Sequence, residues 1–134
     1  MSKMILEIVT PERKVYEKEV EMVVAKGVEG EVGIMANHIP FVTPLKIAPL
    51  RAKHEGGEDV IAVNGGFMEV RKDKVVVLAE TAELPEDIDT ERARAALERA
   101  ERRLASKDGN IDIRRAEIAL AKAKNRLAVA SRKK

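Results

Sequence analysis

Arginine and lysine residues recur at helical spacing in the last third of the chain, where their side chains could bind a multiply charged anion. At 100° per residue, two expected helices each carry one basic flank. The flanks comprise Arg92, Arg99 and Arg103 in the first helix and Arg115, Lys122 and Arg126 in the second. Two such flanks can face each other only across an anionic group, and guanidinium groups bind phosphate or carboxylate through paired N–H donors. For any single arginine, a solvated face paired with neighbouring glutamates is the alternative.

A helical hairpin must position these side chains. The first helix begins after Pro85, with Asp87 or Asp89 as its N-cap, and SKDGN at 106–110 ends it. Asp112 caps a second helix after this short turn, so the two helices should run antiparallel. Apolar residues at spacings of three and four form the two buried seams: Ala93, Leu97, Ala100 and Leu104, then Ile113, Ala116, Leu120, Ala123, Leu127 and Ala130. So few large side chains predict a hairpin that is marginal alone and must dock on another surface.

Residues 1 to about 84 carry the signals of β-structure. Short runs rich in β-branched residues alternate with turn clusters, which predicts a sandwich or a flattened barrel. RKDK at 71–74 and HEGGED at 54–59 are expected hairpin turns, and NGGF at 64–67 is expected to form a tight turn or a bulge between strands. The glycines and prolines of residues 27–45 predict an ordered loop held by apolar anchors.

Charge divides the chain into two parts. Residues 1–86 contain 11 Lys and Arg against 15 Asp and Glu, a net charge of −4, whereas residues 87–134 contain 14 against 8, a net charge of +6. We therefore predict an α+β protein with a β-sandwich domain at 1–86 and a helical hairpin domain at 87–134.

No apolar run approaches the ~20 residues of a membrane-spanning helix. The sequence contains no cysteine, which excludes thiol catalysis and cysteine zinc sites.

Catalytic patterns are missing from the sequence. The two histidines, His38 and His54, fall in different expected loops without a recognisable arrangement of carboxylates or serines, and a single loop histidine is usually structural. Neither a GxxxxGK[ST] phosphate loop nor an HExxH zinc motif occurs, and no metal site is predicted. The chain is therefore not expected to be an enzyme by itself.

Three segments in order resemble one known family. GEVGIMANHIPFVTPL, NGGFMEVRKDKVVVLAETAE and DIDTERARAALERAERRL are similar to the epsilon subunit of the bacterial F-type, or rotary, ATP synthase, and the similarity runs from LEIVTPERKVYEKEVEMV to the C-terminus. The resemblance implies an antiparallel sandwich of about ten strands that binds the gamma subunit and the membrane rotor ring of c subunits. It also implies a two-helix domain that either folds down on the sandwich or extends into the alpha/beta catalytic head and impedes ATP hydrolysis. Such a subunit lies at the cytoplasmic face of the cell membrane as a peripheral protein, with membrane contact only through the complex.

The resemblance also implies a regulatory nucleotide site. In the bacillus-type members, an [IL]DxxRA motif in the folded-down hairpin helps to bind one ATP. The residues that match this site are Ile88, Asp89, Arg92 and Ala93 of the motif, with Glu83, Arg99 and Arg126 elsewhere. Lys122 stands where similar members carry arginine, which keeps the charge but loses the planar fork. Whether magnesium accompanies ATP is left open. Glu31 and His38 match positions near the rotor ring.

Two other classes of function compete with a rotary-ATPase subunit. The basic hairpin could bind nucleic acid or another polyanion, but aromatic residues make up only 2% of the chain and the attached sandwich is acidic. A nucleotide enzyme of a new kind is the third alternative. The resemblance favours the coupling and regulatory subunit, with no nucleic-acid partner.

Overall fold

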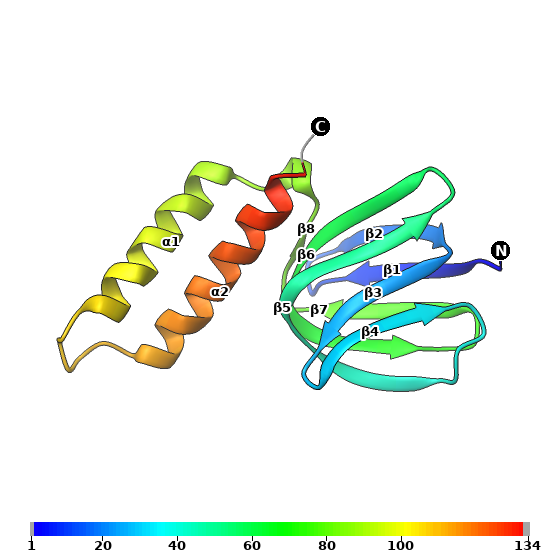
Figure 1. The fold of residues 1–134 in the computed structure, drawn as a ribbon, viewed down its shortest axis with the longest axis horizontal. Coiled ribbons are helices and arrows are strands. Elements are labelled where there is room, and N and C mark those ends of the chain that lie inside the picture. Colours follow the sequence, from blue (N-terminus) through cyan, green and yellow to red (C-terminus); the bar gives the residue numbers. More distant parts are fainter. Residues whose placement is uncertain (1, 133–134) are drawn as a thin grey trace.

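The computed structural model describes residues 2–132 and consists of a β-sandwich followed by two antiparallel helices (Figure 1). The strands are β1 (Met4–Val9), β2 (Lys14–Val20), β3 (Met22–Gly27), β4 (Gly30–Met35), β5 (Phe41–His54), β6 (Gly57–Val70), β7 (Lys74–Ala79) and β8 (Ala82–Glu83). A 3-10 turn at Pro85–Asp87 leads into α1 (Thr90–Ala105) and α2 (Ile113–Ala130). The predicted α+β class, with a sandwich before a helical hairpin, is confirmed.

The strands form one mixed sheet that folds around a single core. Its order is β2-β1-β7-β6-β5-β3-β4, with β8 paired to β6; β1 and β7 are parallel, and the other pairs are antiparallel. Side chains from all eight strands meet in the core, among them the fully buried Leu6, Ile34, Ile61 and Met68. Eight strands are described, which is roughly consistent with the about ten that the resemblance implies. The segment on both sides of NGGF forms one continuous strand, β6.

Glycines allow β6 to remain continuous through NGGF. Gly65 and Gly66 have φ values of 86° and 128°, which L side chains rarely adopt. A Cβ on Gly66 would lie 2.1 Å from the carbonyl oxygen of Leu78 on β7. The glycine pair therefore provides the irregular backbone predicted here, but inside a strand rather than between two strands. The expected hairpin turns at 54–59 and 71–74 are confirmed, because β5 and β6 meet at His54 and Gly57, and the N–H of Arg71 donates to the carbonyl of Lys74.

The prediction of a loop over residues 27–45 is wrong. Most of this segment is extended, with β4 and the first part of β5 in regular antiparallel pairing. Gly27 and Gly30 close a tight turn between β3 and β4, and Pro40 precedes β5. Pro44 is tolerated in the ladder because β3 ends opposite it. Its carbonyl accepts a hydrogen bond from Val28, and an N–H on the same side would point past the end of β3.

Both helices begin at the residues that their capping signals predict. Asp89 caps α1 by accepting from the N–H of Arg92 at 3.0 Å, and Asp112 caps α2 by accepting from the N–H of Arg115 at 3.1 Å. The alanines of both predicted seams are buried, and the leucines are half-buried. Ile113, the first residue of α2, is the exception, with 61% of its surface exposed.

The hairpin is folded down on the sandwich, with α2 against the sheet and α1 packed on α2 (Figure 1). A small apolar cluster joins Val60 and Ala62 of β6 to Ile88, Val129 and Ala130. Neither described helix is long and apolar enough to cross a membrane.

Buried amide side chains complete the contact between α2 and the sheet. Asn125 of α2 is 5% exposed, and its Nδ2 donates at 3.1 Å to the carbonyl of Val63 and at 3.1 Å to Oδ1 of Asn64. Asn64 in turn donates to the hydroxyl of Thr81 at 2.9 Å. These bonds give the docked position a direction and register that apolar contacts alone do not provide.

Candidate functional site

A cleft of about 760 Å³ lies where the hairpin meets one end of the sandwich. Its walls come from the turn between β1 and β2, the turn between β7 and β8, the start of the hairpin and both helices. Ala93 and Ala96 of α1, with Val15 and Ala82 of the sandwich, provide apolar surface. A flat aromatic base could pack on such a surface while polar groups bind the rest of the ligand.

Four guanidinium groups line this cleft. Arg92 and Arg99 come from α1, Arg126 from α2 and Arg13 from the sandwich. Within residues 2–132, only Arg126 of the four makes an ion pair, through its Nε to Glu83. The Nη donors of Arg126 are not used in that bond, so it can hold Glu83 and still contact an anion. The remaining three arginines converge on one cavity without a carboxylate partner, which is the arrangement expected of a site for a multiply charged anion.

Carboxylates also line the cleft, and two of them have identifiable tasks. Glu83 orients Arg126. Asp89 uses Oδ1 to cap α1, which leaves its second oxygen able to accept from an amino group in the cleft. Glu12, Glu80 and Asp87 add negative charge to the same walls. The cleft is therefore mixed in charge and suits a ligand that carries both hydrogen-bond donors and negative charge.

Six of the eight residues predicted for the ATP site lie on this cleft: Glu83, Asp89, Arg92, Ala93, Arg99 and Arg126. Ile88 is 2% exposed and packs in the apolar cluster between β6 and α2. Lys122 is half-buried on α2, one turn before Arg126, and is not among the residues that line the cleft. The structure thus brings most of the predicted set together, and places these two beside the site.

The β1–β2 turn is a wall of the cleft that the sequence did not predict. The turn after β1, residues 10–13, forms this wall, and it is 70 or more residues from the motif on α1. No local pattern marks a surface turn as one wall of a distant cavity. Only the docking of α2 on β6 brings this turn close to the motif on α1.

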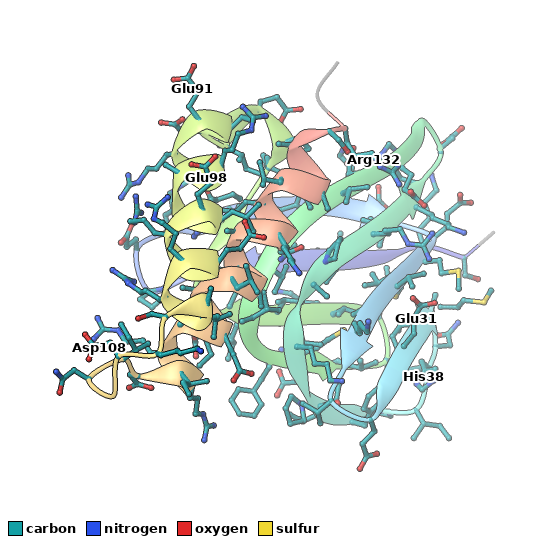
Figure 2. The ribbon with its side chains drawn as sticks, turned by 60° about the vertical axis from the view of Figure 1, so that its left-hand side comes forward. Glu31, His38, Glu91, Glu98, Asp108 and Arg132 are labelled. Carbon is teal, nitrogen blue, oxygen red and sulfur yellow. The ribbon has the colours of Figure 1, made fainter. Side chains whose placement is uncertain are left out.

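Glu31 and His38 lie on the β3–β4 side of the sandwich, away from α1 (Figure 2). Both side chains are exposed, Glu31 on β4 and His38 in the turn that follows it. The His38 ring packs at 5.3 Å, centroid to centroid, on Phe41. Exposed apolar side chains flank this turn: Met35, Ile39 and Val42 are 49%, 79% and 62% exposed. An exposed group of this kind on a stable domain is typical of a surface that contacts another protein.

A separate titratable cluster ties β2 to the β5–β6 hairpin. Oδ2 of Asp59 accepts from the hydroxyl of Tyr16 at 2.7 Å and from Nζ of Lys18 at 2.8 Å, and it lies 3.1 Å from Nε2 of His54. Burial raises the pKa of Asp59, but the hydrogen bonds from Lys18 and Tyr16, with the nearby His54 ring, outweigh it and lower that pKa to about 2. Burial, with the bond to Asp59, raises the pKa of Tyr16. This cluster stabilises the sandwich and does not line the cleft.

Family models match nearly all of the described chain. The ATP synthase delta/epsilon chain β-sandwich domain matches residues 3–85, and the long α-helix domain of the same chain matches residues 86–131. The chain belongs to the ATP synthase delta/epsilon chain family. The resemblance noted in the sequence is thereby confirmed.

Individual relatives agree with this membership. The chain is 67% identical over 108 residues to the ATP synthase epsilon chain of Brevibacillus brevis, which covers 80% of this chain and 82% of the relative. It is 59% identical over 100 residues to the epsilon chain of Shouchella clausii, covering 75% of each. A chain in the mitochondrial ATP synthase structure of Euglena gracilis has a TM-score of 0.81 and 29% identity, covering 98% of this chain and 82% of that one. The chain is therefore a non-catalytic chain of the ATP synthase epsilon type, as expected.

Proposed function

We propose that this subunit couples the catalytic head to the membrane rotor ring and regulates ATP hydrolysis through its hairpin, with ATP as the ligand that retains the hairpin on the sandwich. It binds the gamma subunit and the ring of c subunits, and it reaches the alpha/beta head only when the hairpin extends. It acts at the cytoplasmic face of the cell membrane, as a peripheral protein held there by the complex.

The convergence of unpaired arginines on one cleft is the observation that carries the ATP proposal. Arg92 and Arg99 on α1 and the free Nη donors of Arg126 on α2 face a common cavity, where phosphates would relieve their mutual repulsion. The adenine ring fits the apolar surface of Ala93 and Ala96, with its amino group donating to Asp89. The phosphates of ATP would therefore bind arginine donors, and its adenine would bind an apolar surface and a carboxylate acceptor.

The cleft exists only while the hairpin is docked, because its walls belong to both parts of the chain. A ligand that binds one conformation stabilises it by mass action. High ATP should thus favour the folded-down hairpin and permit hydrolysis, and low ATP should release the hairpin for inhibition. The second surface, around Glu31 and His38, supports the rotor contact because charged and apolar side chains are exposed there together.

Calorimetric titration of the isolated subunit with ATP tests the regulatory site. Removal of one charge-assisted contact costs roughly 1.5–3 kcal/mol, about a ten- to hundredfold loss of affinity. Arg92→Ala should show that loss. Arg94→Ala is the matched control, because Arg94 is exposed on the same helix and does not line the cleft. No ATP binding at millimolar concentration, or equal loss in both variants, would contradict the proposal.

A further inference from the structure

Arg13 lies on the sandwich but faces the cleft that the helices complete. Its backbone is fixed by Thr10: the Arg13 N–H donates to Oγ1 of Thr10 at 3.3 Å, and the Arg13 carbonyl accepts from the Thr10 N–H at 2.9 Å and from its hydroxyl at 3.2 Å. Pro11 adds a fixed φ to the same turn. The turn therefore holds Arg13 at the cleft before any ligand binds.

The Arg13 guanidinium makes no ion pair with any residue in the described range 2–132. The next residue, Lys14, differs in this respect, since its Nζ lies 2.7 Å from Glu17 and 3.8 Å from Glu7. Lys14 also does not line the cleft. Lys14 is thus paired with carboxylates of the sandwich, whereas Arg13, the residue before it, lines the cavity without such a partner.

We propose that Arg13 is a phosphate-binding residue of the nucleotide site, contributed by the β1–β2 turn of the sandwich. This inference rests on the proposed function of the cleft. A polyphosphate bound by Arg92 and Arg99 on α1 would contact Arg13 across the cavity, so the ligand itself would join α1 to the sandwich. The protein provides little such connection, because α1 packs on α2 and α2 alone packs extensively on the sheet.

Arg13 also supplies a planar fork that can bind phosphate through two N–H donors. Lys122, one turn before Arg126, gives charge without that geometry and lies beside the cleft rather than on it. The β1–β2 turn thus adds a guanidinium on the sandwich wall of the cleft. The consequence is that Arg13 should affect ATP affinity and ATP-dependent retention of the hairpin, but not the stability of the ligand-free protein.

Calorimetric titration of the full-length chain with ATP tests this inference, using Arg13→Gln with Lys14→Gln as the matched control. Arg13→Gln should weaken ATP binding about fivefold, the effect of one solvent-accessible charge contact. Lys14→Gln should change affinity by less than about twofold. Thermal unfolding without ATP should be the same for Arg13→Gln and the unmodified chain, and the ATP-induced rise in Tm should be smaller in Arg13→Gln.

Three results overturn the inference, and they can be distinguished. If the unmodified chain binds ATP, Arg92→Ala weakens that binding and Arg13→Gln does not, the sandwich contact is wrong and the nucleotide site stands. If the unmodified chain binds no ATP, the proposed function fails and this contact fails with it. Equal weakening by Arg13→Gln and Lys14→Gln also overturns it, because the effect would then reflect net charge rather than a contact in the cleft.

Discussion

Asn125 should control how firmly the hairpin stays on the sandwich. Replacement by alanine removes both hydrogen bonds of Nδ2 and leaves Oδ1 of Asn64, whose residue is fully buried, without that donor. An unsatisfied buried polar group costs about 1–3 kcal/mol. Alanine is the better helix former by roughly 0.5 kcal/mol, which offsets part of the loss. The net effect of about 0.5–2.5 kcal/mol raises the opening constant of the hairpin about two- to seventyfold.

Native-state hydrogen exchange of the α2 amides measures this opening directly. Asn125→Ala should lower the protection factors of the α2 amides as much as it raises the opening constant. The protection factors of the β6 and β7 amides should not change. Lys124→Ala is the control, since Lys124 is exposed at the preceding position of the same helix. Unchanged protection of α2 in Asn125→Ala, or an equal decrease in Lys124→Ala, would refute the idea that the buried amides hold the hairpin.

Four further outcomes are expected. A fragment of residues 1–86 should unfold cooperatively and still bind gamma, because the core is built from the strands; a noncooperative transition would count against the predicted boundary. Asp59 stabilises the fold fully above its unfolded pKa of about 4, and the stability is lost as pH falls towards its folded pKa of about 2. In chemical denaturation, Asp59→Asn should therefore lose less stability over that interval than the unmodified chain. Glu31→Lys should weaken proton-driven synthesis in membranes without changing the Tm of the subunit, and unimpaired synthesis would exclude this rotor contact. Deletion of residues 87–134 should raise ATP hydrolysis by the complex at low ATP, whereas equal rates would exclude hairpin inhibition.

Local signals in the sequence accounted for the helices and for most of the motif-derived site. Capping by Asp89 and Asp112 depends on residues within one turn, so it can be predicted without tertiary information. The three-and-four spacing of alanines likewise identifies the face on which α1 and α2 pack. Arg92 and Arg99, seven residues apart, were expected on one flank, and both line the cleft.

Nonlocal contacts limited the rest. Pro44 argues against a strand when it is considered alone, and only the end of β3 opposite it makes the strand acceptable. Asn125 looks like a polar residue on a solvated helix face, and only its partners on β6 explain its burial. Arg13 is a surface-turn residue until the hairpin docks. Each of these positions is decided by chain segments far away in sequence.

ATP should hold the hairpin on the sandwich in the working enzyme, so the position of the hairpin should follow the ATP concentration. Because the chain contains no cysteine, Glu98→Cys on α1 and Glu19→Cys on β2 would carry two fluorophores at exposed sites. Energy transfer between them, measured in the assembled ATP synthase while ATP is varied from micromolar to millimolar, reports the hairpin position alongside the rate of hydrolysis. We expect high transfer and active hydrolysis at millimolar ATP, and low transfer with inhibited hydrolysis at micromolar ATP. Arg92→Ala should shift the transition to higher ATP. The same transfer at all ATP concentrations, or a transition that Arg92→Ala leaves in place, would contradict it.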